Sequence, residues 1–401
     1  MKLTSKMIEP WNINFWKRLK YLTDDNSKKK KKRVAYIYEK ADTSTFRYRV
    51  YNMFQALSQS KSWVGTYFFE DELSQLTEYL EKIDIVIFAR TRWSLQVDQF
   101  VNLIKKKNIP TAFDMDDLIF DTEKLPLITS TLNVDFDHPE CYSYWFSYSS
   151  RLWLMGKMCD ATIGTNDYLG KKLTDTFNKP SFVINNFLNN EQIAISDKLF
   201  KKKKRRSSKN RFTLGYFSGT PSHINDFRTI APEIDTLLKK HPDITLQVVG
   251  FMEFPNYLSP FVANKQIVHS PLVDYLTLQK KIAEVDINIV PLVDNEFTNC
   301  KSELKFFEAA VVGTLTCATP TYVYRNNIEN EKNGFMCRGG DWYRTIEKIY
   351  KDGIDSKIIL RARGFCLKKY SSEKQLPNIE NVLEEVYSLG SKKAVRKRTN
   401  C

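Results

Sequence analysis

Histidine and cysteine are scarce in this chain, and neither is arranged as a metal site. The 401 residues include four histidines and seven cysteines. No two cysteines form a CxxC motif, and their spacing matches neither a zinc site nor a disulfide framework. An odd number of scattered cysteines in partly apolar settings is typical of a reducing compartment. The sequence therefore predicts an intracellular protein that holds no metal.

Long apolar runs are also missing. No window approaches the roughly 20 uninterrupted apolar residues that would span a bilayer. The opening residues, MKLTSKMIEP, lack the apolar core and the small-residue cleavage site of a secretory signal. We therefore expect a cytoplasmic protein. No internal repeat of solenoid length is present, which excludes a repeat architecture.

Acidic residues are too few to balance the basic ones. Lysine and arginine number 61 against 47 aspartates and glutamates, a formal net charge of +14. Hydrophobic residues make up 42% of the chain and aromatic residues 13%, which is ample for packed interiors. The excess charge predicts an anionic partner, and nucleic acid, acidic lipid or a phosphorylated ligand would satisfy it equally. Because no recognisable nucleic-acid module is present, nucleic acid is not expected.

The chain is long enough for two hydrophobic cores, and three basic stretches punctuate it. Like-charge blocks repel themselves and rarely fold, so these stretches are interpreted as tail, linker and tail. The predicted divisions are a basic amphipathic N-terminal segment (1–32), a first domain (33–190), a basic linker (191–210), a second domain (211–370), a C-terminal helix that can cross back to the first domain (371–390) and a basic tail (391–401).

Both domains alternate short β-branched or aromatic runs with longer amphipathic stretches. Strands are expected at 34–38, 85–89, 111–114, 161–164, 181–184, 212–217, 244–249, 266–269, 287–292 and 314–318. Helices are expected at about 46–57, 94–107, 142–158, 225–240, 274–284, 302–312 and 341–351. Strands that are nearly all apolar predict parallel sheets covered on both faces. The predicted fold is α/β, with two Rossmann-like domains that bind ligands beyond the carboxyl ends of their strands.

The densest group of chemically active side chains follows the strand expected at 287–292. Lys301, Ser302, Lys305 and Glu308 stand at the start of the next helix, with Lys305 and Glu308 about 60° apart around its axis. The unpaired N–H groups of a helix start suit a diphosphate, Lys305 adds a full charge, and Glu308 can accept from ribose hydroxyls. The alternative is a solvated lysine–glutamate pair on an ordinary surface helix.

A second candidate turn follows the first strand of the same domain. Gly219 permits a phosphate to approach the backbone, and Thr220 and His223 can donate hydrogen bonds to it. The alternative is an ordinary strand-to-helix turn capped by Ser222 or Asn225.

The stretch PLVDNEFTNCKSELKFFEAAVVGTLTCATPTYVY resembles the signature of the retaining GT-B glycosyltransferases of family 4. The resemblance covers most of residues 211–351 and implies a nucleotide-diphosphate sugar as donor and retention of the anomeric configuration. It likens Lys305 to the diphosphate-binding lysine and Glu308 to the second glutamate of the E-x7-E motif, which holds the ribose. The first glutamate falls at Cys300, which leaves its sugar contact to Glu303 or a main-chain amide. Neither a metal nor a bound cofactor is expected, because Lys305 and amide dipoles neutralise the leaving group.

Three carboxylates, those of Asp114, Asp116 and Asp117, are the sharpest feature of the first domain. A DxD metal site of a GT-A transferase would not explain the second domain, and a HAD phosphatase motif is broken at Leu118. We favour an acceptor site that faces the cleft, since CDATIGTNDYLGKKL and SFVINNFLN resemble the acceptor domain of the same GT-B family. Part of the cluster can instead cap the next helix.

Arginines follow neighbouring strands of the first domain. Arg47 and Arg49 come after the strand at 34–38 and Arg90 after the strand at 85–89, so all three are candidates for an anionic acceptor or the donor phosphates. The alternative interpretation is that these arginines lie at exposed helix starts and contact only water.

Aromatic and basic residues alternate in the N-terminal segment, which suits an anionic membrane surface. A disordered tail or a segment packed on the first domain would show the same pattern. The expected function is sugar transfer to a glycan, a lipid-linked glycan or a glycoprotein, in the cytoplasm or on the inner face of the membrane. The alternative is a non-catalytic GT-B subunit that binds sugar or scaffolds a partner enzyme.

Overall fold

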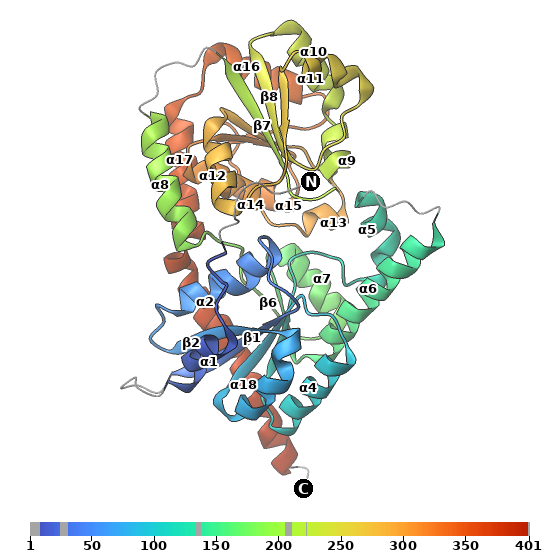
Figure 1. Cartoon of the computed structure of the whole chain (residues 1–401), viewed down its shortest axis with the longest axis vertical. Coiled ribbons are helices and arrows are strands. Elements are labelled where there is room, and N and C mark those ends of the chain that lie inside the picture. The colour runs from blue at the N-terminus through green and yellow to red at the C-terminus, as the bar shows by residue number, and fades with distance from the viewer. Residues whose placement is uncertain (1–8, 25–30, 133–137, 205–210, 222, 400–401) are drawn as a thin grey trace.

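The computed structural model describes residues 9–24, 31–132, 138–204, 211–221 and 223–399 and shows two α/β halves stacked along the long axis (Figure 1). Each half contains a sheet of six parallel strands. The first-half strands are β1 (Lys32–Tyr38), β2 (Trp63–Phe69), β3 (Ile85–Ala89), β4 (Thr111–Asp114), β5 (Ala161–Gly164) and β6 (Ser181–Val183). The second-half strands are β7 (Phe212–Ser218), β8 (Ile244–Gly250), β9 (Ile267–Ser270), β10 (Ile287–Val290), β11 (Leu315–Ala318) and β12 (Phe335–Met336).

Helices cover both sheets. Those of the first half are α1 (Phe15–Thr23), α2 (Asn52–Leu57), α3 (Leu73–Leu76), α4 (Leu95–Lys106), α5 (Leu125–Thr131), α6 (Pro139–Met158) and α7 (Asp167–Phe177), with short turns η1 (Arg47–Tyr51), η2 (Glu70–Glu72), η3 (Thr77–Lys82) and η4 (Thr122–Lys124). After α8 (Asn190–Lys204) come α9 (His223–Arg228), α10 (Ala231–Lys240), η5 (Asn256–Leu258), α11 (Ser259–Ala263), α12 (Tyr275–Glu284), α13 (Glu296–Asn299), α14 (Leu304–Val311), α15 (Tyr322–Asn327), α16 (Trp342–Asp352), α17 (Ser356–Tyr370) and α18 (Ser372–Thr399). None of the helices in the described ranges is both long and apolar enough to cross a membrane.

All ten expected strands are present within two residues of their expected ends, which confirms the α/β prediction. Two strands were not predicted: β2, whose run is interrupted by Gly65, and the two-residue β12. The strand orders are β2-β1-β3-β4-β5-β6 and β12-β11-β10-β7-β8-β9. The order reverses between β1 and β3 in the first sheet and between β10 and β7 in the second. Ligands of such sheets bind at these reversals, beyond the carboxyl ends of the strands.

The structure differs from the expected basic linker and tail. Residues 190–204 form α8, while 205–210 lie outside the described residues. The helix is stabilised because Leu199 packs on an apolar cluster and the Lys203 ammonium donates to Val285 O at 2.6 Å and Thr314 Oγ1 at 2.7 Å. At the other end, helix α18 continues to Thr399 through the residues expected to be a tail.

The N-terminal segment packs on the first half over its described part. Helix α1 lies against β2 and buries Phe15, Leu19 and Leu22. The Arg18 guanidinium is buried as well, donating to Tyr67 O at 2.7 Å and pairing with Glu72. The apolar face of α1 is therefore covered by protein.

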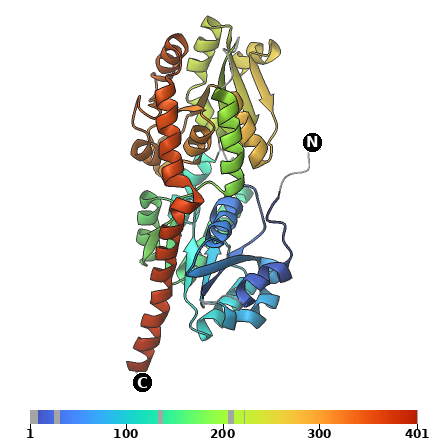
Figure 2. The same cartoon turned by 90° about the vertical axis from the view of Figure 1, so that its left-hand side faces the viewer.

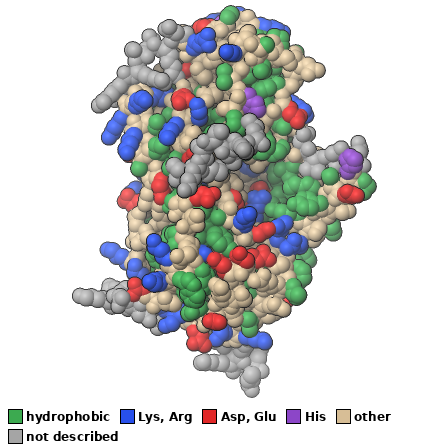
Figure 3. Space-filling model, viewed as in Figure 1, with side chains coloured by type: hydrophobic (Ala, Val, Ile, Leu, Met, Phe, Trp, Pro, Cys, Tyr) green, Lys and Arg blue, Asp and Glu red, His purple; other side chains and the backbone are tan. Residues whose placement is uncertain are grey.

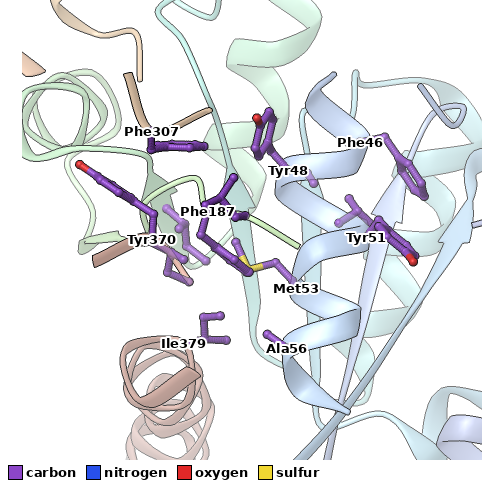
Figure 4. Close-up of a cluster of buried hydrophobic side chains, with 14 of the residues drawn as sticks. Phe46, Tyr48, Tyr51, Met53, Ala56, Phe187, Phe307, Tyr370 and Ile379 are labelled. Atoms are coloured by element: carbon purple, nitrogen blue, oxygen red, sulfur yellow. The ribbon is translucent and has the colours of Figure 1, made fainter. Parts of the chain in front are cut away.

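One apolar cluster joins the two halves. Figure 4 shows Tyr48 of η1, Phe187 of the connection, Phe307 of α14 and Tyr370 of α17 converging in it. The ring centroids of Tyr48 and Phe307 are 6.2 Å apart and those of Phe307 and Tyr370 are 4.8 Å apart. Helices α17 and α18 run one after the other along the side of the molecule and span both halves (Figure 2). Packing of this kind fixes how the two sheets face each other.

Gly250, at the end of β8, has a backbone that only glycine tolerates. Its φ is +105°, and an added Cβ would lie 1.8 Å from the carbonyl oxygen of Ser218. We expect Gly250→Ala to lower the free energy of unfolding by roughly 1–3 kcal/mol, since the backbone of β7 must move. Exposed Gly364 in α17 is the matched control, because an added Cβ meets nothing within 4 Å. Gly364→Ala should stabilise the helix by about 0.5–1 kcal/mol in the same urea titration. Equal effects of the two substitutions would contradict this account.

Candidate functional site

The two strand-order reversals face each other across the junction. From the first half come Thr45, Arg90, Asp116 and Asp117, which follow β1, β3 and β4. From the second half come the turn after β7 and the segment between β10 and α14. In Figure 3, side chains of both charges lie together near the middle of this face, beside a hydrophobic area. The structure thus brings most of the predicted residues to one interdomain region.

Lys305, in the first turn of α14, points back at the end of β7. Its ammonium donates to the carbonyl oxygen of Phe217 and lies 5.7 Å from the centre of the Tyr216 ring. Burial lowers the pKa of Lys305 to about 8, and the charge of Lys301 acts in the same direction. Lys305 is therefore a half-buried cation beside the β7 turn.

His223 begins α9 and forms a buried pair with Asp226. Its Nδ1 lies 2.8 Å from Asp226 Oδ2, while Asp226 Oδ1 accepts from the backbone N–H of Val293 at 3.0 Å. Burial, together with the charges of Lys305 and Lys301, lowers the pKa of His223 to about 3 against the opposing effect of Asp226. His223 is therefore neutral at physiological pH.

The turn after β7 is open. An added Cβ on Gly219 would meet nothing within 4 Å, and Gly219 and Thr220 are exposed. Ser218 Oγ donates to Thr220 O at 3.2 Å. Of the two alternative caps, Ser222 lies outside the described residues, and the side chain of Asn225 donates to Ser130 O at 3.4 Å.

Lys301 and Ser302 precede α14 instead of lying on it, because the chain turns between Asn299 and Leu304. Asn166 of the first half donates to Cys300 O at 3.0 Å and to Lys301 O at 3.2 Å. Ser302 Oγ accepts from Asn186 at 3.1 Å. This turn is therefore held by the first half.

Glu308 lies buried where the halves meet. Its Oε1 accepts from the Tyr48 hydroxyl, lies 3.5 Å from Arg47 Nη2 and accepts from Gln192 at 3.4 Å. Tyr48 and Arg47 belong to η1, a π-helical turn, a form that is frequent at functional sites. Within the described chain, no hydrogen bond reaches the other oxygen, Oε2, and Arg47 Nη1 has no partner. Lys305 and Glu308 therefore do not form a solvated pair on the surface of the helix.

Asp114 and Arg49 lie inside the first half and bind each other. The distances are 2.7 Å from Arg49 Nε to Oδ1 and 2.8 Å from Nη2 to Oδ2, and both side chains are 1% exposed. Arg49 Nη1 also donates to Ile184 O at 2.7 Å and to Asn186 Oδ1 at 3.1 Å. Burial raises the pKa of Asp114, and Arg49 opposes the shift. With both oxygens occupied, this pair holds the connection to α8 and does not face the cleft.

Asp116 and Asp117 face Arg90. Asp116 accepts from Thr45 Oγ1 at 2.7 Å and from Arg90 Nη1 at 3.1 Å, and Asp117 Oδ2 lies 3.8 Å from the same nitrogen. Burial raises the pKa of Asp117, while Arg90 and, from the second half, Lys301 lower it. Arg90 itself has a φ of +47°, a strained conformation of the kind that clusters at active sites.

In the part of the chain that the structure describes, neither Cys300, at the position of the first motif glutamate, nor Glu303, its suggested substitute, is bonded to the β7 turn. Cys300 is buried in the first-half apolar cluster, and Glu303 accepts from the Tyr370 hydroxyl on the side of α17. Among the described residues, no group of three or more His, Cys, Asp and Glu side chains is arranged to hold a metal ion.

Three site residues were missed from the sequence. Tyr48, Thr45 and Asp226 contact Glu308, Asp116 and His223, respectively. Tyr48 and Thr45 belong to the run that supplied Arg47 and Arg49, so the position after β1 was the available signal. Asp226 stands one helical turn after His223, a spacing typical of a capping pair.

Solved structures show the same architecture. HepE from Anabaena, in complex with UDP and glucose, superposes with a TM-score of 0.60 at 11% identity over 88% of this chain and 100% of that one. A glycosyltransferase from Rickettsia africae gives 0.57 at 15% identity, covering 89% and 99%. Sucrose-phosphate synthase from Thermosynechococcus elongatus gives 0.50 at 11% identity, covering 92% and 100%. No family model and no curated protein matches the sequence.

These similarities identify the fold. The chain has the GT-B arrangement of two Rossmann-like domains whose parallel sheets face an interdomain cleft. The identities are too low to carry an activity from one chain to the other.

The Arg49–Asp114 pair should be structural. Asp114→Asn leaves a buried guanidinium without its counter-charge, so we expect a loss of about 3–5 kcal/mol in unfolding free energy. Glu39→Gln, which breaks the exposed pair with Arg92, is the control and should cost less than about 1 kcal/mol. Urea unfolding measures both, and a stable, inactive Asp114→Asn protein would instead indicate a chemical role.

The low pKa of His223 makes the free energy of unfolding depend on pH. The folded form stays neutral down to about pH 3, whereas the unfolded form takes up a proton near its ordinary pKa of 6.5. Between these values the unfolded state binds more protons, so this contribution is present above pH 6.5 and is lost as the pH falls towards 3, at up to about 1.4 kcal/mol per unit. His223→Asn should reduce this slope in urea titrations at a series of pH values. An unchanged slope would contradict the assignment.

Proposed function

We propose that this protein is a glycosyltransferase that takes its sugar from a nucleotide-diphosphate donor bound in the interdomain cleft. The observation that supports this most strongly is that Lys305, in the first turn of α14, reaches the end of β7, where its ammonium donates to Phe217 O beside the open turn at Gly219. A cation beside an open glycine turn is suited to a phosphate group, and Lys301, in the turn before α14, adds a second positive charge to the same side of the cleft.

The diphosphate would lie between the β7 turn and the start of α14. There it can replace Phe217 O as the partner of the Lys305 ammonium and approach the backbone at Gly219. Glu308 would offer its free oxygen, Oε2, to the ribose while Oε1 stays bonded to Tyr48. HepE was solved with UDP in the same fold, which agrees with a nucleotide in this cleft.

The acceptor would bind on the first-half side, against Arg90, Asp116 and Asp117. Exposed aromatic side chains line α6 nearby: Tyr144 is 58% exposed, Phe146 49% and Trp153 37%. Such a surface suits the sugar faces of a glycan or the chain of a lipid-linked glycan. Attachment to the inner face of an anionic membrane belongs to the same proposal, with the basic excess of the chain as its support.

Transfer would proceed with retention and without a metal. As the sugar–phosphate bond breaks, negative charge develops on the diphosphate, and Lys301 and Lys305 would neutralise it. Asp114 is occupied by Arg49, and Asp116 by Thr45 and Arg90, so neither is placed as a covalent nucleophile. Attack by the acceptor on the face from which the diphosphate leaves agrees with this arrangement.

A non-catalytic GT-B subunit is the second candidate. It is favoured by Cys300, which stands where the resembled family has its sugar-binding glutamate and is fully buried. Such a subunit could bind sugar or hold a partner enzyme without transferring anything.

Lys305→Ala separates these functions. UDP, GDP, ADP and dTDP are first screened by thermal shift, and the purified protein is given the matching nucleotide sugars to detect slow hydrolysis. We expect one nucleotide to stabilise the protein and its sugar conjugate to turn over. In Lys305→Ala the stabilisation should be lost and turnover should fall by roughly 10²–10³.

Lys348→Ala is the control, because Lys348 is 60% exposed and, among the residues that the structure describes, forms an ion pair with Glu331 alone. It should keep both signals. Nucleotide binding without turnover of any nucleotide sugar would favour the non-catalytic subunit. Absence of any nucleotide binding would overturn the donor site itself.

A further inference from the structure

A polar cavity lies at the junction and is lined by Glu303, at the end of the 300–303 turn, but not by Lys305. Its volume is about 330 Å³, at the small end of the range of ligand pockets. Its walls come from the first half (Asn166, Asn185), the second half (Glu303, Tyr322) and the C-terminal helices (Lys369, Gln375). Glu303, one of the two candidates for the sugar contact of the missing first glutamate, lines the cavity, and the other predicted donor and acceptor residues do not.

The turn between Asn299 and Leu304 separates the cavity from the cleft. Glu303 lines the cavity, whereas Lys305 bonds the β7 turn. The segment of the first half that faces this turn is divided in the same way. Asn185 lines the cavity, whereas the side chain of its neighbour Asn186 is hydrogen-bonded to Ser302 and Arg49. A ligand in the cavity would therefore not occupy the donor site.

The cavity contains hydrogen-bonding capacity that the protein does not use. Gln375 is 7% exposed and lines the cavity, its Nε2 donates to Lys369 O at 2.7 Å, and its Oε1 has no partner in the described structure. A buried acceptor without a hydrogen-bond donor lowers the stability of the folded protein, and a bound ligand that donates to it would remove this cost. Lys369 uses its ammonium on Asn327 Oδ1 at 2.6 Å and keeps further protons available.

The chemistry of the walls points to a neutral ligand rich in hydroxyl groups. Six carboxamide side chains line the cavity: Asn166, Asn185, Asn326, Asn327, Gln375 and Asn378. Carboxamides donate and accept, as hydroxyl groups do. The one lysine is offset by Asp167 and Glu303, so the cavity has no excess of positive charge to hold a phosphate. Tyr322 adds a ring against which the apolar face of a sugar can pack.

We propose that this cavity is a separate binding site for a neutral sugar or polyol of monosaccharide size, and that its ligand bridges the two halves. The ligand would contact Asn185 and Tyr322, one from each half, together with Gln375 of α18. Because it binds residues of three parts at once, it stabilises their present arrangement.

The test uses the full-length protein with glucose, N-acetylglucosamine and sorbitol as probes and inorganic phosphate as the charged comparison. Binding is followed by ligand-observed NMR and thermal shift. At least one neutral probe should bind, and saturating UDP should not displace it. Gln375→Leu and the milder Tyr322→Phe should each weaken it by roughly tenfold. Lys305→Ala, which alters only the cleft, should bind the probe normally.

Three results would overturn the proposal: no neutral probe binds, phosphate binds in preference to them, or UDP or Lys305→Ala abolishes the sugar signal. The last result would place the sugar in the donor cleft. Circular dichroism of both cavity variants checks folding, and Tyr322→Phe retains the ring if Gln375→Leu does not fold. Loss of nucleotide binding alone would reject the donor site and leave this proposal standing.

Discussion

The burial of the Glu308 carboxylate between two halves of the chain is the constraint on which this site depends. A charge removed from water needs hydrogen-bonding partners, and here Tyr48 and Gln192 supply them, with Arg47 3.5 Å away. Tyr48 also packs on Phe307, the residue before Glu308, so the polar contact and the apolar cluster fix the same position. Because η1 follows β1 and α14 follows β10, this contact sets the reversal of one sheet opposite that of the other.

The remaining site residues take their places from that contact. Lys305, one turn before Glu308, is carried to the end of β7, and the turn that contains Lys301 is held by Asn166 and Asn186 of the first half. The result is a cationic second-half wall that faces an anionic first-half wall, with Lys301 close enough to influence Asp117. A diphosphate would meet the cations, and a hydroxyl-bearing acceptor would meet the carboxylates.

The positions of the strands could be predicted from the sequence, but the roles of the charged residues that follow them could be predicted only in part. Apolar runs report burial directly, so the strands and the segment from Lys301 to Glu308 could be located. The partner of a charged side chain cannot be read from local sequence. Asp114, Asp116 and Asp117 look alike along the chain, yet Asp114 is bound by Arg49, 65 positions away, while Asp116 and Asp117 face Arg90. The strand ends at Asp114, and the next two carboxylates lie in the loop that follows, where Arg90 contacts them.

The basic stretches also show that local sequence does not reveal tertiary contacts, because segments predicted to be unfolded form helices. A run of lysines predicts repulsion only if its charges stay in water, and Lys203 instead donates to a backbone carbonyl and a hydroxyl of the second half. Helix α8 could form because Leu199 gave it an apolar contact, and α18 because its earlier residues Ile379, Leu383 and Val386 are buried in the shared cluster. Tertiary burial of a few apolar side chains therefore outweighs the local charge. For that reason α8, which composition alone assigns to a linker, is a helix packed against the second half.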